Sequence, residues 1–416
     1  MNRFAKIKDI AALNKETFKK DSFPNIIKYL DTGSLTKNKI EGFQRFNTKS
    51  EKIPSRAQRK VFTNTILYST VRPNQEHYGI IERDFKDIVV STGFTTIDIT
   101  DENTYPKYIF YLLTQKSITD YLHTIGMNAV SSYPSISPDD IGNLKFRLPD
   151  LPTQKSIAKV LSDLDAKIEL NNRINRELEA MAKTLYDYWF VQFDFPNEQG
   201  KPYKSSGGKM VYNKELKREI PEGWEVKKLG DYASIKKGTL ITENTADSTG
   251  KVKVVSAGID FSYYHSKANY SENTITISAS GANAGYINFW REPIFACDCT
   301  TVRGKNTAET LQILGFLKMR QYFLYKQARG SAQPHVYPKD VEVLFISIPP
   351  IKLIEEFGKL TVPSNKQITY NLKQNQQLSA LRDWLLPMLM NGQITVKEAE
   401  EKLSMAAEPS VEYKKG

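Results

Sequence analysis

The stretch from Leu148 to Phe190 constrains the fold of this chain more than any other part of it. Apolar residues and asparagines recur there with strict 4-3 spacing, the pattern of the buried seam of a coiled-coil helix. A buried asparagine costs stability but fixes the register and orientation of packed helices. The sequence therefore predicts a long helix that packs on another helix through Ile157, Leu161, Leu164, Ile168, Asn171, Asn175, Leu178 and Leu185.

The same seam recurs 200 residues later, with both asparagines in register. Between positions 134 and 185, a shift of 200 gives 12 identities in 52 positions, where average composition predicts roughly one in sixteen. The starts of the two halves also match, at an offset of 222, through Lys6-Ile-Lys-Asp-Ile-Ala-Ala and Lys228-Leu-Gly-Asp-Tyr-Ala-Ser. One seam alone could belong to an ordinary core helix, but two copies indicate a duplicated module. The second seam contains Ile368, Asn371, Asn375, Leu378 and Leu385.

The second seam is eroded at its beginning and at Arg382. Proline lacks the amide hydrogen that a helix interior needs, so Pro363 should interrupt the helix. We expect a short helix to end near Thr361 and the long one to begin near Ser364.

The interior of each half combines strands with one helix. Runs of β-branched residues predict strands at 60–71, 87–99, 274–280, 286–290 and 293–302, and amphipathic patterns predict helices at 107–122 and 311–324. The glycines at 281–285 fit a hairpin turn better than a loop that contacts DNA directly, although both remain open. Residues 194–210 are rich in Gly, Pro, Ser and Lys and predict an irregular linker. A charged helix and a frayed tail are expected after Gly392.

Composition limits the class of protein. A chain of 416 residues suggests two or three domains, and no apolar run approaches the ~20 residues that cross a bilayer. The N-terminus lacks an export signal, and the two cysteines, Cys297 and Cys299, form no disulfide framework, so we expect a cytoplasmic protein. A net charge of +11 favours a polyanionic partner.

Motifs for chemistry are missing from the sequence. A methyltransferase acting on a base amine needs a glycine-rich cofactor loop and an Asn/Asp-Pro-Pro-aromatic loop, and nucleotide hydrolysis needs a phosphate-binding loop; none is found. The four histidines are scattered, which argues against a metal site. We therefore predict no catalytic, cofactor-binding or metal-binding residues on this chain.

Candidate DNA contacts are polar and aromatic loop residues able to bind phosphates or base edges. Each alone could be an ordinary solvated surface residue, and the set is more persuasive than any member. In the first half they are Arg56, Arg59, Lys60, Arg72, Asn74, Gln75 and His77. In the second half they are Lys236, Lys237, Tyr263, Tyr264, Lys267, Asn283, Arg291, Arg303, Arg329, Gln333 and His335.

The chain as a whole resembles the specificity (S) subunit of type I restriction-modification enzymes. The residues that carry the resemblance are the run 148–171, Phe193-Asp-Phe-Pro-Asn, Pro202-Tyr-Lys-Ser-Ser-Gly-Gly-Lys-Met, Ile220-Pro-Glu-Gly-Trp, Ile348-Pro-Pro-Ile and Asn391-Gly-Gln-Ile. The resemblance implies an α+β fold with two β-rich target-recognition domains, joined by two long antiparallel coiled-coil helices in a pseudo-two-fold repeat. The implied segments are a first recognition domain (1–147), a first spacer helix (148–192), a linker (193–222), a second recognition domain (223–347), a second spacer helix (348–392) and a tail (393–416).

The resemblance also implies a function and partners. Each recognition domain would read one part of a split, asymmetric sequence in double-stranded DNA. The seams would set the spacing and dock two modification subunits, which use S-adenosylmethionine to methylate adenine N6. Restriction subunits using ATP and Mg²⁺ would be further partners, and this chain itself would carry no cofactor and no catalysis.

Helix length agrees with this picture independently. A helix over residues 164–190 is ~40 Å long at 1.5 Å per residue, equivalent to on the order of 12 base pairs at 3.4 Å each. The alternative is a stand-alone architectural coiled-coil DNA-binding protein without enzyme partners, which co-purification would distinguish. A third hypothesis, an enzyme in its own right, predicts S-adenosylmethionine binding or DNA turnover by the isolated chain.

Overall fold

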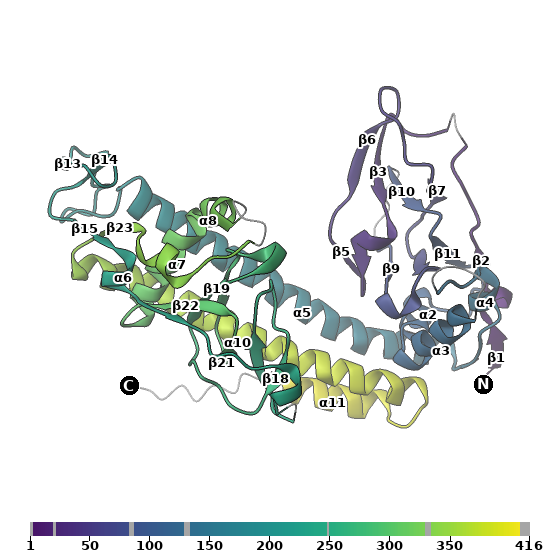
Figure 1. The fold of residues 1–416 in the computed structure, drawn as a ribbon. Coiled ribbons are helices and arrows are strands. Elements are labelled where there is room, and N and C mark those ends of the chain that lie inside the picture. The colour runs from purple at the N-terminus through teal and green to yellow at the C-terminus, as the bar shows by residue number, and fades with distance from the viewer. Residues whose placement is uncertain are drawn as a thin grey trace. The chain divides into compact units, whose positions relative to one another are not determined.

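The computed structural model describes residues 3–19, 22–82, 87–128, 134–247, 249–328 and 334–407. The chain forms two compact units, which we call the first unit (Met1–Glu169 with Gln376–Gly416) and the second unit (Leu170–Asn375). Each contains small sheets and parts of two long helices, α5 (Leu151–Tyr186) and α10 (Ile351–Met390) (Figure 1). Within the described ranges, no helix is both long and apolar enough to span a bilayer.

The first unit contains two four-stranded sheets. Their strands are β2 (Ala11–Leu13), β3 (Ile26–Leu30), β6 (Gln44–Asn47), β7 (Ala57–Lys60), β8 (Ile66–Ser69), β9 (Tyr78–Ile80), β10 (Ile88–Ser91) and β11 (Phe94–Ile99). One sheet has the order β2-β11-β8-β9 and is antiparallel throughout; the other has the order β6-β3-β10-β7, with β3 and β10 parallel. Every residue of β8 and β10 is buried, which explains why both strands read as continuous apolar runs. The strand predictions at 60–71 and 87–99 are therefore confirmed.

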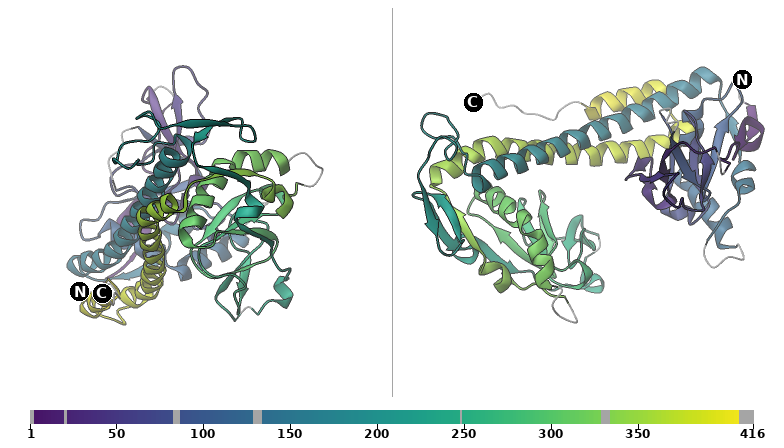
Figure 2. Two further views of the ribbon diagram at one scale, coloured as in Figure 1. Left: turned by 90° about the vertical axis from the view of Figure 1, so that its left-hand side faces the viewer. Right: turned by 90° about the horizontal axis from the view of Figure 1, so that it is seen from above.

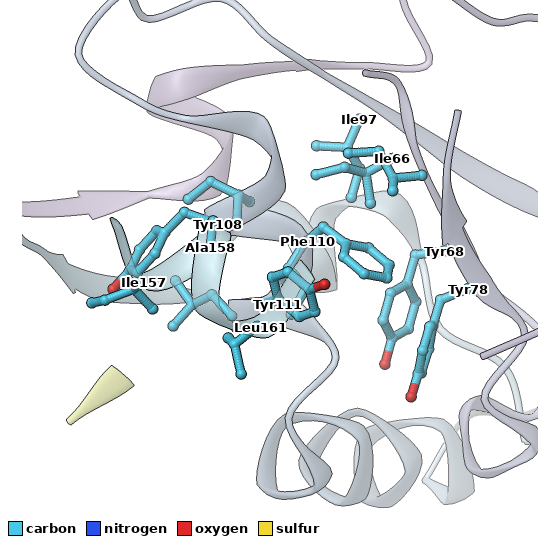
Figure 3. Packing of buried hydrophobic residues seen from close by; sticks show 14 of the residues in the cluster. Ile66, Tyr68, Tyr78, Ile97, Tyr108, Phe110, Tyr111, Ile157, Ala158 and Leu161 are labelled. Carbon is cyan, nitrogen blue, oxygen red and sulfur yellow. The ribbon is translucent and has the colours of Figure 1, made fainter. Parts of the chain in front are cut away.

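The core of the first unit joins one sheet to a helix and to the beginning of α5. The helix is α2 (Pro106–Leu113), whose Tyr108 is fully buried. Figure 3 shows Ile66, Tyr68, Tyr78 and Ile97 from the strands, Tyr108, Phe110 and Tyr111 from α2, and Ile157, Ala158 and Leu161 from α5. The seam of α5 thus contributes directly to the core of the globular part.

The second unit repeats this plan. Its strands are β16 (Ser234–Lys237), β17 (Val252–Val255), β18 (Tyr263–His265), β19 (Thr274–Ser278), β20 (Ile287–Trp290), β21 (Ile294–Ala296) and β22 (Cys299–Arg303). The sheet orders are β16-β22-β19-β20 and β18-β17-β21, and β17 and β21 are parallel, as β3 and β10 are. β19 and β20 pair antiparallel on either side of residues 281–285, so the predicted hairpin turn is confirmed.

A two-stranded antiparallel ribbon closes each unit. β1 (Arg3–Lys6) pairs with β12 (Lys145–Leu148), and β15 (Glu225–Lys228) pairs with β23 (Phe345–Ile348). Arg3 faces Leu148, and Glu225 faces Ile348, so the partners differ by the offsets of 222 and 200 found in the sequence. The same offsets relate α1 (Ile7–Ile10) to α6 (Leu229–Tyr232) and α4 (Pro138–Gly142) to α9 (Pro338–Glu342). The residues that pair in the two ribbons correspond one to one, as the predicted duplication requires.

The two long helices contact each other within each unit, and Figure 2 shows them side by side. In the second unit, Asn171 Nδ2 donates to Asn375 Oδ1 (2.9 Å), and Asn371 Nδ2 donates to Asn175 Oδ1 (2.8 Å). Asn171 pairs with Asn375 and Asn175 pairs with Asn371, so the residue numbers run in opposite directions along the two helices and the helices are antiparallel.

Most of the predicted seam is buried. Ile168, Leu178 and Leu185 are half-buried, and the other seam residues are buried. In the first unit, the seam leucines of both helices belong to one core. Knobs-into-holes packing in the strict coiled-coil sense stays a prediction.

The expected break at Pro363 is wrong, because α10 continues through it. Pro363 lies on the exposed face. The hydroxyls of Thr361 and Ser364 donate to helix carbonyls at 2.9 Å and 3.2 Å. Buried residues on both sides, Phe357 and Ile368, hold the helix in place. Packing therefore outweighs the loss of one backbone hydrogen bond.

Both predicted amphipathic helices are pairs of helices. α2 is followed by α3 (Lys116–Met127), and α7 (Thr307–Met319) is followed by α8 (Gln321–Ala328). The extended backbone of Gln115 separates the first pair, and its side chain donates to the Leu112 carbonyl. Hydrophobic periodicity continues across these breaks, so it did not reveal them.

The expected irregular linker is partly ordered by a hairpin. β13 (Met210–Asn213) pairs with β14 (Arg218–Pro221), and Phe195 stacks on Trp224 with ring centroids 5.4 Å apart. The charged helix expected after Gly392 is α11 (Val396–Ala407), whose Ala399 is buried in the first unit's core. The tail beyond residue 407 lies outside the described residues.

Candidate nucleic-acid interface

A strained turn in the first unit carries three of the predicted DNA contacts. The turn η2 (Pro73–Gln75) joins β8 to β9, and Arg72 and Glu76 on either side have φ of 47° and 55°. Left-handed conformations are costly for side chains other than glycine and concentrate at functional sites. The Arg72 amide donates to the Pro134 carbonyl at 2.8 Å, which anchors the turn. The side chains of Arg72, Asn74 and Gln75 are all exposed on it.

A hairpin next to this turn was missed in the sequence. β4 (Leu35–Thr36) and β5 (Lys39–Ile40) present Lys37, whose Nζ lies 2.7 Å from Glu76 Oε2. The signal was available, since the positive φ of Asn38 at a two-residue turn suits asparagine. His77 is half-buried, and its Nδ1 lies 2.8 Å from the Leu35 carbonyl, so His77 holds this hairpin in place.

The remaining first-unit candidates lie at β7. Arg56 is exposed. Burial lowers the pKa of Arg59, whose Nε has no hydrogen-bond partner among the described residues. Lys60 Nζ lies 3.2 Å from Glu16 and 5.2 Å from the centroid of the Phe18 ring. Of the three, Arg56 is the one whose side chain is exposed.

The second unit places three predicted residues around one recess. β16 ends with the exposed Lys236 and Lys237. Ser280 forms a bridge with His335, in the place where Val71 bridges Ser135 in the first unit. Lys237 and His335 line the recess, and Asn283 lies in the adjoining turn η5 (Gly281–Asn283).

Tyrosines on the other sheet form a separate group. The Tyr263 hydroxyl donates to the Ile241 carbonyl at 2.7 Å and so ties the loop after β16 to β18. Tyr264 and Lys267 are exposed, and the Tyr264 ring lies 4.9 Å from that of Phe261. Tyr264 and Lys267 are thus available to a ligand, whereas Tyr263 is a positioning residue.

Arg291 and Arg303 are held by other residues. The Arg291 side chain is 15% exposed, and its guanidinium lies 3.0 Å from Glu179 and donates to Asn365 at 2.8 Å. Arg291 thus connects the end of β20 to α5 and α10, and its role as a DNA contact stays a prediction. Arg303 donates to Ser271 Oγ at 2.6 Å. Arg329 and Gln333 lie outside the described residues.

Metal-ligating side chains are not clustered in the part of the chain that the structure describes. No three His, Cys, Asp or Glu side chains there are placed to hold a metal ion. Burial raises the pKa of Cys299 to about 12, so its thiol stays protonated and a poor nucleophile at neutral pH. The surfaces described above are suited to binding.

The chain belongs to the family described as the type I restriction modification DNA specificity domain, whose sequence profile matches residues 2–180 and 221–377. Specificity subunits of type I restriction systems are non-catalytic subunits that recognise DNA sequence, and this chain is of that class. The family resemblance drawn from the sequence is thereby confirmed.

Similar proteins extend over nearly the whole chain. The HindI specificity subunit of Haemophilus influenzae is 24% identical, with 93% of this chain and 98% of that protein covered. The MjaIX specificity subunit of Methanocaldococcus jannaschii is 28% identical, with 84% and 82% covered. The crystal structure of the S subunit from M. genitalium is similar in fold, with a TM-score of 0.59, 17% identity, and 94% and 96% covered.

Proposed function

We propose that each unit reads one half of a split, asymmetric DNA target, and that α5 and α10 set the spacing and dock two modification subunits for adenine N6 methylation. The observation that carries this proposal is the identical strand register at both ends of the two units. A duplicated frame presents two comparable surfaces, and each can bind a separate stretch of DNA.

The two surfaces differ where contact with DNA is expected. The exposed turn of the first unit carries Arg72, Asn74 and Gln75, whereas the corresponding turn of the second unit is Gly281–Asn283. Arginine and the amides are the side chains that bind guanine and adenine edges in the major groove. The two turns occupy the same place in the same fold but carry different side chains, which favours two half-targets of different sequence.

The docking proposal rests on the outer faces of the long helices. Leu170, Ile174 and Met181 on α5 and Leu360 on α10 are between 37% and 64% exposed, although they lie in well-formed helices. Exposed apolar residues on a helix are typical of protein interfaces. A repeat in this chain fits two copies of one partner, which would bring S-adenosylmethionine and, with restriction subunits, ATP and Mg²⁺.

Co-expression with the methyltransferase subunits of a type I system tests the proposal. We expect a complex with two methyltransferase copies per chain that methylates adenine in a two-part motif. Arg72→Ala should relax one part of that motif and leave the other part unchanged. A chain that binds DNA fully without a methyltransferase, or that methylates nothing in its presence, would favour the stand-alone architectural protein.

A further inference from the structure

The recess in the second unit contains a carboxylate, which is unexpected on a surface that binds a polyanion. It is lined by Lys237, Asp298, Thr300, His335 and Tyr337. Asp298 Oδ2 accepts a hydrogen bond from the Ser280 hydroxyl at 2.7 Å, and no described residue donates to Oδ1. Phosphates repel such a group, whereas the amino groups on base edges donate to it.

A second observation points to a ligand at the same place. Thr300 is 1% exposed, yet its Oγ1 has no hydrogen-bond partner among the described residues. Buried hydroxyls without a partner are costly, and a ligand in the recess would offset that cost.

The rim of the recess suits a nucleic acid. The His335 and Tyr337 rings are stacked, 5.7 Å apart at 14°, and Tyr337 is 57% exposed. Lys237 is exposed and lies in none of the ion pairs found among the described residues, so its charge is available to a phosphate. A flat aromatic pair, a cation and an acceptor are therefore gathered at one opening.

The first unit shares the lysine (Lys15) and the buried threonine without a partner among the described residues (Thr95) of this frame but lacks the carboxylate and the aromatic pair. In the first unit, Phe94 of β11 pairs with Ser69 of β8, and in the second unit Cys299 of β22 pairs with Ser278 of β19. Gly93, the residue before Phe94, therefore occupies the position of Asp298, the residue before Cys299. Likewise, the bridge of Val71 with Ser135 places Ser135 in the position of His335, and the offset of 200 places Ser137 in the position of Tyr337. The strand framework is the same in both units, while the side chains at the positions of Asp298, His335 and Tyr337 differ, as expected of residues that determine specificity.

We propose that Asp298 is a specificity-determining residue of the second unit, which accepts a hydrogen bond from the exocyclic amino group of a cytosine or adenine in the major groove. Lys237 binds an adjoining phosphate and contributes affinity without selecting a base. This inference rests on the proposed function, because it assumes that the second unit reads one half of the target.

The test compares Asp298→Asn with Ser280→Ala in the complex with methyltransferase subunits. Asparagine keeps an acceptor for Ser280 but offers the base a donor in place of one oxygen. We expect Asp298→Asn to lower discrimination at one base pair of one half-target by about 5- to 150-fold, the range of a single base contact, as measured by binding to a library of target variants. Asp298→Ala should relax the same position, and Ser280→Ala, which keeps the carboxylate, should leave the motif unchanged.

Further results test the roles given to Lys237 and Asp298. Lys237→Ala should weaken binding to all sequences alike and reduce the slope of log affinity against log salt by about 1. Unchanged discrimination in folded Asp298→Asn and Asp298→Ala complexes would overturn the inference, as would the same relaxation in Ser280→Ala, since Asp298 would then act only by holding the hairpin. If the wild-type complex recognises no two-part motif, the proposed function fails, and this inference fails with it.

Discussion

Replacing Asn171 by alanine should destabilise the pair of long helices more than any exposed substitution beside it. Asn171 is 2% exposed, and its Nδ2 donates to Gln374 Oε1 (2.8 Å) and Asn375 Oδ1 (2.9 Å). Both acceptors are themselves buried, so the substitution leaves two polar atoms without a donor. At about 1–3 kcal/mol for each buried unsatisfied group, the expected loss is about 2–6 kcal/mol.

Urea denaturation followed by far-ultraviolet circular dichroism measures this loss. Arg173→Ala, an exposed neighbour on the same helix, is the matched control and should change the free energy of unfolding by less than about 0.5 kcal/mol. A double-mutant cycle with Asn375→Ala should give a coupling energy of about 0.5–3 kcal/mol. Equal stability of the Asn171→Ala and Arg173→Ala chains would refute the assignment of this asparagine to a buried, hydrogen-bonded seam.

Three further outcomes are expected. Leu164→Asp buries an unpaired charge at a fully buried seam position beside Leu161, so it should abolish soluble assembly, which size-exclusion chromatography would detect. Arg72→Ala should leave the melting temperature unchanged and weaken DNA binding or relax its specificity in a gel-shift titration, because its side chain is exposed; a large drop in melting temperature would contradict this. Burial raises the pKa of Tyr68 and of Tyr108 to about 12, above the ~10 of the unfolded chain. Stability should therefore be complete below pH 10 and fall between pH 10 and 12 by about 1.4 kcal/mol per pH unit for each tyrosine, and the phenylalanine variants should show a shallower fall.

The parts of the fold that the sequence predicted are those governed by periodicity and repetition. The seams placed both long helices and their buried asparagines, because a 4-3 pattern maps directly onto one helix face. The offsets of 222 and 200 predicted that the two halves begin and end alike, and the closing ribbons agree with this residue by residue. These signals are local or internal to the sequence, so one chain is enough to find them.

What escaped prediction depends on tertiary contacts. Pro363 stays helical because its neighbours are buried, and nothing in the sequence around it reports that burial. β3 and β6 lie in a stretch with little alternation, and they are strands through pairing with β10 and with each other. Arg291 looks like any exposed cation in the sequence, and its ion pair with Glu179 joins residues far apart in the chain.

Three of the candidate contacts occupy one turn, and their contact with DNA stays a prediction. Arg72, Asn74 and Gln75 are presented together because a short turn exposes all of its side chains. The proposed role of Asp298 has no counterpart among these candidates, since a lone carboxylate in a strand-rich stretch of a basic chain gives no signal until the recess around it is seen.

The ribbons that pair β1 with β12 and β15 with β23 have an evolutionary consequence. Each ribbon brings the first and last residues of a globular part together. The segments 7–144 and 229–344 are therefore each closed by one pair of strands. Recombination at the two strands of one ribbon could exchange the whole segment between them and leave the long helices unchanged. A lineage carrying this gene could thus acquire a new DNA preference in one genetic step, without changing the two long helices.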